Sequence, residues 1–433
     1  MHGGHVIITA GFKSVHISHV ELTKMGQPQL GRYPLHWHLA SDVGPDGYED
    51  PSSFEYNSIH NAFNRWITVH GTNNARVIGN VGYHTRGHGY FIEDGNEKGT
   101  IFDGNLGMVA HQGIVLPTDK GSTLCRDAKE GWQGHVSTSA CQATSIFWIS
   151  NIYTYIDNNF AVGGNACYWI LPHNSQFWAS SRDHPPGPWT NNRGSSCNQG
   201  LFVESVVEDR LPEESRPIAQ FGRFGGRQAA TYDGNALNGC YPVTFDGWKI
   251  HHTRTHGAWI RQGTVIFKNS QFSDCPRCFT YPTADCPDQY HIISDTVFQG
   301  FTENIGNPEY DFITNTGMIE IHQNGQFTNG GVNMYVRWHK GPDGVYRTDA
   351  QHKLFPTRGI NVYDTFVPTY HFNLKFFDYP FSETKFNSAF GMHIANRFGM
   401  TADDALFYNN TFDNVGRKVY FGDVGPVSIR LSA

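Results

Sequence analysis

The sequence predicts an all-β chain that folds as a parallel β-solenoid. Two observations predict it: short motifs recur at a nearly constant interval, and the composition is that of short strands and tight turns. The 433 residues include 47 Gly, 31 Phe and 20 Tyr, and only 16% are charged, against roughly 25% in an average soluble domain. No leucine pattern and no 3.6-residue periodicity points to a leucine-rich or helical repeat.

The repeat is carried by two motifs. Gly-Asn-Val-Gly at 79–82 recurs as Gly-Asn-Leu-Gly at 104–107, which is 25 residues later. The stretch 267–272 (Phe-Lys-Asn-Ser-Gln-Phe) recurs 26 residues later at 293–298. Further copies lie at 245–250 and 407–412. Each coil of such a solenoid buries its inward residues against its two neighbours, and Asn or Asp suits the bends because both tolerate a left-handed backbone.

Strand-like runs begin within the first residues, at 6–12, and continue as the repeat proceeds. Four polar segments interrupt them, and we expect these to emerge as loops on one face of the solenoid. They cover residues 43–56, 117–140, 172–235 and 322–357. No linker divides the chain, so residues 1–433 are expected to form a single β-helix domain.

Charge and motif content exclude several classes of protein. The net charge of −7, with 23 His uncounted, argues against a broad nucleic-acid-binding surface but leaves room for a local basic groove. No run of 18 apolar residues predicts a transmembrane segment. The chain has no nucleophile elbow, P-loop, dinucleotide fingerprint or HExxH motif.

The eight cysteines fit an oxidising compartment. Cys125 and Cys141 bracket a polar excursion and are the pair we expect to be bridged. Cys275 and Cys278 form an isolated CxxC, which favours a disulfide or thiols over zinc because no second ligand pair lies nearby. Asn409 begins a glycosylation sequon. The first residues have no signal-peptide pattern and open straight into a strand-like run, so we expect a fragment or an incomplete gene product.

The densest polar chemistry lies at 31–111. His36 and His38 alternate along one strand and therefore project from the same face. Adjacent coils stack about 4.8 Å apart, so His38, His70 and Glu93 form a column if they occupy equivalent positions on successive coils. The groups expected beside this column are Asp42, His88 and Asp94.

Such a cluster suits two reactions on a polysaccharide. Hydrolysis needs one carboxyl group as acid and another as base or nucleophile, for which Asp42, Glu93 and Asp94 are the candidates. Lyase chemistry needs a base for the proton next to a uronate carboxylate and a cation that neutralises that carboxylate. Its candidates are His36, His38 and His70, with Arg32 or a bound cation. The alternative is a structural histidine ladder, because solenoids often stack like residues.

The stretch 31–42 (Gly-Arg-Tyr-Pro-Leu-His-Trp-His-Leu-Ala-Ser-Asp) resembles the GRYPIHFHLAGD signature of the CEMIP family of hyaluronan-binding proteins and cell-surface hyaluronidases. Trp37 and Ser41 depart from that signature. Supporting matches follow in order at 58–60, 68–71, 87–88, 93–95, 116–117, 256–261, 358–360 and 421–426. The resemblance therefore spans nearly the whole chain.

The resemblance implies a right-handed parallel β-helix at the cell surface or outside the cell. It implies binding or internal cleavage of hyaluronan or a related acidic polysaccharide, with calcium in some members. It also implies that an upstream eight-glycine domain and C-terminal modules of full-length relatives are missing here. The catalytic candidates are Asp42, Glu93, Asp94, His38 and His70. The substrate-binding candidates are Arg32, His36, His60, His88 and His256.

Within this set, Glu93 and Asp94, together with Asp42, are expected to be the acid and base. The histidines are expected to position substrate or to hold a divalent cation whose identity the sequence leaves open. Three alternatives remain at this stage: a hyaluronan-binding or adhesion module without turnover, a polysaccharide lyase, and a structural solenoid.

Overall fold

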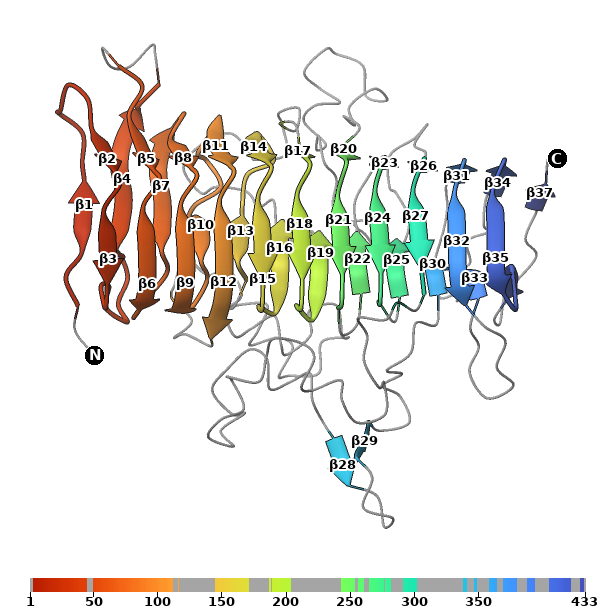
Figure 1. Cartoon of the computed structure of the whole chain (residues 1–433). Helices are drawn as coiled ribbons and strands as arrows, with labels where there is room; N and C mark the ends of the chain where they lie inside the picture. Colours follow the sequence, from red (N-terminus) through yellow and green to blue (C-terminus); the bar gives the residue numbers. More distant parts are fainter. Residues whose placement is uncertain are drawn as a thin grey trace, which may run out of the picture.

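The computed structural model is a right-handed parallel β-helix, whose coils follow one another from β1 to β37 (Figure 1). Three parallel sheets run along its axis, and the described residues contain no helix that is long and apolar enough to cross a bilayer. The structure describes residues 3–44, 50–111, 116, 145–170, 187, 189–203, 243–253, 256–260, 265–275, 277–281, 291–300, 302, 338–340, 346–348, 358–363, 369–379, 388–393, 405–421 and 429–431.

Each coil contributes one strand to each sheet, except that the last described coil has strands in sheets A and B alone. Sheet A contains β1 (Val6–Ile8), β4 (Leu35–Asp42), β7 (Ile67–Asn73), β10 (Tyr90–Ile92), β13 (Phe147–Ile149), β16 (Ala166–Ile170), β19 (Gln199–Val203), β22 (His256–Ile260), β25 (Arg277–Tyr281), β30 (Arg358–Tyr363), β33 (Ser388–His393) and β36 (Val419–Phe421). Sheet B contains β2 (His16–Ser18), β5 (Ser53–Glu55), β8 (Arg76–Ile78), β11 (Thr100–Asp103), β14 (Thr154–Asp157), β17 (Trp189–Thr190), β20 (Val243–Asp246), β23 (Val265–Lys268), β26 (His291–Ser294), β31 (Thr369–Phe372), β34 (Ala405–Tyr408) and β37 (Ile429–Leu431). Sheet C contains β3 (Glu21–Thr23), β6 (Ser58–Ala62), β9 (Val81–Arg86), β12 (Leu106–His111), β15 (Phe160–Val162), β18 (Arg193–Ser195), β21 (Lys249–His251), β24 (Gln271–Ser273), β27 (Val297–Gln299), β32 (Lys375–Tyr379) and β35 (Thr411–Val415).

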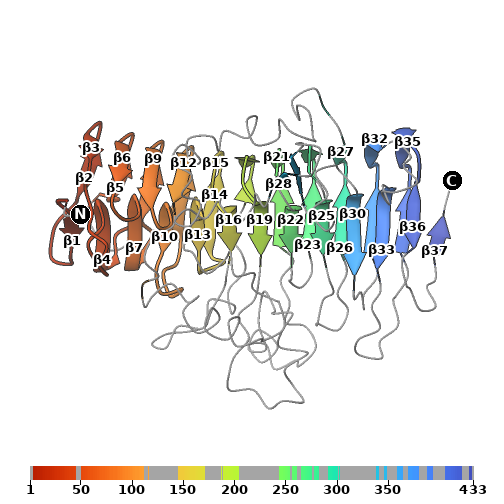
Figure 2. The same cartoon turned by 90° about the horizontal axis from the view of Figure 1, so that it is seen from below.

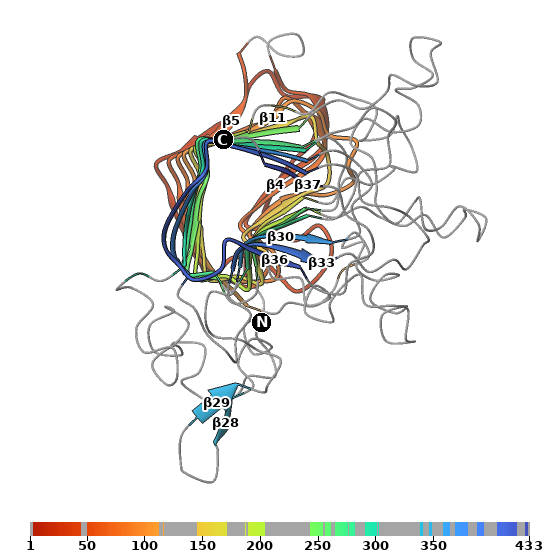
Figure 3. The ribbon, with the colours of Figure 1, turned by 90° about the vertical axis from the view of Figure 1, so that its right-hand side faces the viewer.

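The register between coils confirms the repeat that the sequence predicted. Val81 pairs with Leu106, and Phe267 pairs with both Phe245 and Ile293. Viewed along the axis, the three sheets superimpose coil on coil and enclose one interior (Figure 3). The same order of coils is seen from below (Figure 2). Repeated motifs therefore occupy equivalent places on successive coils.

Several segments that we predicted to be loops contain strands. The segment 43–56 includes β5, the segment 172–235 includes β17, β18 and β19, and the segment 322–357 includes the antiparallel pair β28 (Trp338–Lys340) and β29 (Tyr346–Thr348). These strands are only two to five residues long, so Gly, Ser and Asn around them hide the pattern. The segment 117–140 and the predicted Cys125–Cys141 pair lie outside the described residues.

Aromatic rings stack along the interior of the solenoid. Phe272, Phe298, Phe376 and Phe412 form one such stack, with successive ring centroids 5.3, 5.2 and 5.4 Å apart and ring planes within 14° of parallel. Burying a Phe side chain contributes about 1.5–3 kcal/mol. Because each ring of the stack belongs to a different coil, the core extends along the axis.

A ladder of buried Asn side chains supports one bend of the coils. It consists of Asn57, Asn80, Asn105, Asn159 and Asn192. The side-chain oxygen of each later member accepts a hydrogen bond from the backbone N–H of the member before it, at 2.9–3.1 Å. The ladder satisfies polar backbone groups that would otherwise be buried without partners. Exposed Asn residues such as Asn158 (φ 57°) supply the left-handed backbone that the sequence predicted at bends.

One disulfide joins neighbouring coils of the core. Cys167 lies on β16, and Cys197 lies just before β19, the strand that pairs with β16. Their Cα atoms are 5.7 Å apart, and both side chains are fully buried. Our sequence reasoning did not identify this pair. Cys275 and Cys278 are buried thiols, and the Sγ of Cys278 lies 3.3 Å from the hydroxyl of Tyr379.

Buried histidines are expected to make the fold sensitive to acid. His371 is fully buried against Phe407, and burial lowers its pKa from 6.5 to about 3. Between these values the unfolded chain binds a proton that the folded chain does not. The contribution of each such histidine to the free energy of unfolding is therefore fully present above pH 6.5. Below this pH the free energy of unfolding falls by about 1.4 kcal/mol per pH unit for each such histidine. Urea unfolding at a series of pH values measures this slope.

Replacing His371 by Phe removes one of the titrating groups while keeping an aromatic ring in the stack. The slope of stability against pH is expected to become shallower in this variant, whereas His16→Phe, at an exposed position on β2, leaves it unchanged. An unaltered slope in His371→Phe would show that His371 is protonated in the folded chain.

Candidate functional site

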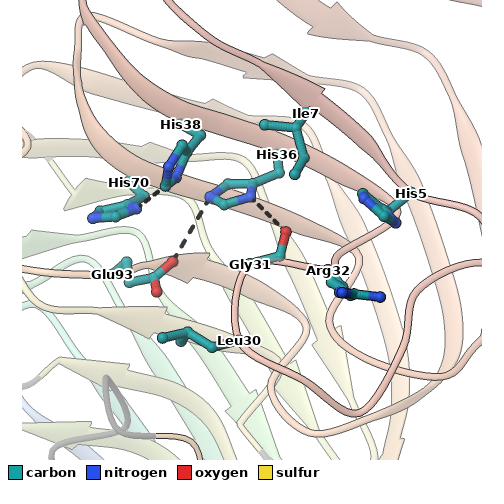
Figure 4. A pocket seen from close by; sticks show the side chains of 9 residues that line it. All are labelled: His5, Ile7, Leu30, Gly31, Arg32, His36, His38, His70 and Glu93. Carbon is teal, nitrogen blue, oxygen red and sulfur yellow. Dashed lines mark hydrogen bonds and ion pairs between the residues drawn. The ribbon is translucent and has the colours of Figure 1, made fainter.

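The predicted column of polar side chains is present on the outer face of sheet A (Figure 4). Trp37 of β4 pairs with Val69 of β7, and both point into the core. Side chains alternate along a strand, so the next residues, His38 and His70, project outward, and they pair with each other. Glu93 follows Ile92, which pairs with Val69, so Glu93 continues the column on the third coil.

The column borders a pocket of about 530 Å³. The lining residues are His5, Ile7, Leu30, Gly31, Arg32, His36, His38, His70 and Glu93. Arg32 supplies a permanent positive charge at the rim, and its Nη1 donates to Gln27 Oε1 at 2.7 Å. Glu93 is the one carboxylate among the lining residues. The pocket therefore combines one permanent cation, one carboxylate and several imidazole rings.

Glu93 is held in place by buried groups from two other coils. Its side chain is almost fully buried; the Tyr33 hydroxyl donates to its Oε1 at 3.4 Å, and Arg65 Nη1 lies 3.7 Å from its Oε2. The Arg65 guanidinium stacks 3.4 Å from the centroid of the Phe91 ring. Arg65 was not among the candidates predicted from the sequence. Its position directly before the strand-like run that contains His70 could have indicated that it lies near the site.

His36 is buried in its neutral form. Its Nδ1 lies 3.0 Å from the carbonyl oxygen of Gly31, so Nδ1 carries the proton and donates it there. Its Nε2 has no hydrogen-bond partner and lies 3.9 Å from Glu93 Oε2. Burial lowers the pKa of His36 to about 3. The side chain therefore presents a bare nitrogen lone pair toward the site.

His70 contacts both the ring of His38 and the carboxylate of Asp94. Its Nε2 lies 2.9 Å from Asp94 Oδ2, and its Nδ1 lies 2.9 Å from His38 Nδ1. Burial alone would lower the pKa of His70, but the hydrogen bond to Asp94 and the charge of Glu93 outweigh it, so the pKa is raised. Burial, followed by the neighbouring His70, lowers the pKa of His38. The two rings therefore differ in their affinity for a proton.

Glu97 organises the turn that presents Asp94, and it was absent from our sequence-based candidates. Its carboxylate accepts three backbone hydrogen bonds, from Gly71 at 2.9 Å, Asp94 at 3.0 Å and Gly95 at 2.7 Å. It is fully buried, and burial raises its pKa to about 7 although the hydrogen bonds from Gly71 and Asp94 oppose the shift. Glu97 thereby ties the end of β7 to the turn after β10.

The Asp42 carboxylate accepts hydrogen bonds from a turn and not from the residues of this cluster. A β-bulge between His38 and Ser41 alters the register of β4 before Asp42. Its Oδ1 accepts from the backbone N–H of Gly44 at 2.9 Å and from Asn74 Nδ2 at 2.8 Å. In this position Asp42 closes a turn, so the contacts favour a structural role over the predicted catalytic one.

Three predicted substrate-binding histidines also lie apart from the pocket lining. His60 is on sheet C, where its Nε2 lies 2.7 Å from Glu21 Oε1. His88 is buried against Trp148, and its Nδ1 lies 2.5 Å from Ser145 Oγ. His256 is on β22, several coils further along sheet A, packed against Trp259. Of the predicted residues, Arg32, His36, His38, His70, Glu93 and Asp94 come together.

Comparison with known proteins shows a family match in the first half of the chain and similarity to relatives over nearly all of it. Residues 1–202 match the family model described as the CEMIP beta-helix. The chain is 31% identical to the human protein named cell surface hyaluronidase CEMIP2, over 98% of this chain and 30% of that protein. It is 31% identical to the cell surface hyaluronidase of Danio rerio, again over 98% of this chain and 30% of the relative.

A third relative is the mouse cell migration-inducing and hyaluronan-binding protein, which is 30% identical over 98% of this chain and 31% of its own length. The chain thus spans about a third of the length of the curated relatives that it matches.

Proposed function

The chain belongs to the CEMIP family through its β-helix, and on that premise we propose that it binds hyaluronan or a related acidic polysaccharide and cleaves it internally by hydrolysis. The observation that carries the proposal is the position of Glu93 and Asp94, two neighbouring carboxylates beside a pocket with a basic rim. We further propose a cell-surface or extracellular location, which the names of the relatives support.

The charges around the pocket suit a polymer that carries a carboxylate on every second sugar. Arg32 at the rim offers a planar guanidinium, which can hold a sugar carboxylate through two parallel hydrogen bonds. His5 lies on the same side of the pocket in Figure 4. Because the protein as a whole carries a net charge of −7, the guanidinium of Arg32 is the group that would direct an anionic chain to this side of the pocket.

Hydrolysis requires two carboxyl groups in different settings. Glu93 lies beside the Arg65 cation, which stabilises its charge, so we assign it the role of base or nucleophile. The side chain of Asp94 is 29% exposed and lies 2.9 Å from His70 Nε2, so the two groups can share one proton, and we assign Asp94 the role of acid with that proton. His70 orients Asp94 through its Nε2. His36 and His38 position substrate or hold a divalent cation.

The test is light scattering on size-separated, high-molecular-weight hyaluronan after incubation with the purified chain. It is run with added calcium and with a chelator, because calcium is part of the expectation from the family. A fall in polymer mass supports the proposal. Ultraviolet absorbance of unsaturated uronates in the products would reveal a lyase instead. Unchanged polymer mass with co-eluting protein would identify a binding module and contradict cleavage by this chain.

A further inference from the structure

We propose that His36, His38 and His70 form a binding site for a transition-metal ion of the zinc class. Among the residues that the structure describes, these three bring their ligand atoms within 4.8 Å of one another. They come from two adjacent coils and face the pocket (Figure 4). Metal binding at these three histidines can be measured whether or not the chain cleaves hyaluronan.

The hydrogen-bond partners of His36 and His70 are those of metal ligands. His36 donates its Nδ1 proton to the Gly31 carbonyl, which leaves the lone pair of a fully buried and unpartnered Nε2 directed into the site. His70 directs Nε2 to Asp94, which leaves Nδ1 for an ion. Histidines that bind metals usually donate their second nitrogen to a carbonyl or a carboxylate. Both kinds of outer partner are present here.

The distances require only a local adjustment. Two nitrogen ligands on a tetrahedral ion with bonds of 2.0–2.1 Å are about 3.3 Å apart. The Nδ1 atoms of His38 and His70 are 2.9 Å apart, so they need to separate slightly. Ligand atoms of the three histidines that are 4.8 Å apart, the upper limit within this cluster, have to approach by about 1.5 Å to reach the roughly 3.3 Å spacing. His38 is the least buried of the three rings, and a rotation of this ring, which now contacts His70, would change these distances.

The donor set selects the class of ion. Imidazole nitrogens suit Zn²⁺, Co²⁺, Ni²⁺ and Cu²⁺, whereas Ca²⁺ takes six to eight oxygen ligands. The three rings offer no oxygen, and the nearest carboxylate to His36 is Glu93, at 3.9 Å. Three protein ligands leave a fourth position on a tetrahedral ion, directed toward the pocket, as in catalytic zinc sites. Water or a sugar oxygen could occupy that position.

The test is calorimetric titration of the chelator-treated chain with zinc chloride. We expect one zinc ion per chain. His38→Ala is expected to weaken zinc binding by more than about 100-fold, and Asp94→Asn by about 10–100-fold through loss of the outer carboxylate. His16→Ala removes an exposed histidine from sheet B and is expected to bind zinc as the parent chain does. Circular dichroism confirms that each variant is folded.

A second measurement examines the ligands in the parent chain. X-ray absorption at the zinc edge is expected to show a nitrogen and oxygen shell at about 2.0–2.1 Å with imidazole scattering and no sulfur. Equal zinc affinity in the parent chain and in His38→Ala would overturn the site. So would a sulfur shell, or the absence of stoichiometric zinc binding. Loss of zinc binding in His38→Ala would uphold the metal site even if hyaluronan remained intact in every assay.

Discussion

On the proposed function, replacing Glu93 by Gln is expected to slow hyaluronan cleavage by about 10²–10⁴-fold, the usual contribution of a general acid or base. Gln keeps the size of the side chain and an oxygen that can accept from Tyr33, but it cannot take up a proton or attack the sugar. The measurement is the initial rate of chain scission, followed by light scattering. Retention of at least a tenth of the parent rate would remove Glu93 from the catalytic role.

The matched control is Glu55→Gln. Glu55 also faces an arginine, with Arg76 Nε 3.6 Å from its Oε1, but this pair is partly exposed on sheet B. Loss of the pair there is expected to leave scission unchanged. Glu93→Gln also leaves the buried Arg65 without its carboxylate, which destabilises the fold. Melting curves and hyaluronan binding therefore accompany the rate measurement, and a folded variant that binds without cutting is the expected outcome.

Asn105→Ala is expected to cost about 3–5 kcal/mol of unfolding free energy, because it removes a central member of the Asn ladder. The side-chain oxygen of Asn105 accepts from the backbone N–H of Asn80 at 2.9 Å, and its Nδ2 donates to the Val77 carbonyl at 2.8 Å. Neither water nor Ala can replace these bonds at a position that is 1% exposed. Urea unfolding at neutral pH measures the loss.

The control for this prediction is Asn158→Gly. Asn158 donates to Asp103 at the surface, and Gly accommodates its left-handed backbone (φ 57°) without strain. We expect a change below about 1 kcal/mol there. Comparable losses in the two variants would mean that the ladder contributes no more than an exposed turn does.

The repeat made the architecture predictable, because inward residues of a solenoid recur at the spacing of its coils. Phe267 and Ile293 were matched by sequence and pair in the structure. The column of His38, His70 and Glu93 followed from the same reasoning, since alternation along a strand fixes the face of each side chain. Repetition thus carried information about both the coils and the part of the site that lies on consecutive coils.

Contacts that depend on bulges, on turns and on the register between distant strands could not be predicted from the sequence. Asp42 shares a strand with His38, but the bulge between them alters the register, and no sequence pattern predicts this bulge. Arg65 and Glu97 act from the turns before and after strands, where spacing along the chain is irregular. The pairing of Cys167 with Cys197 requires the register of β16 and β19, whose surroundings looked like a loop.

The Cys167–Cys197 bond also affects how the molecule would respond to force. Tension along the axis of a solenoid pulls directly on the hydrogen bonds that join one coil to the next, and those bonds yield one coil at a time. At β16 and β19 a covalent link lies in parallel with them. Tension on a chain that unravels from one end would pass directly between Cys197 and Cys167, so residues 168–196 could not be extended while the bond is intact.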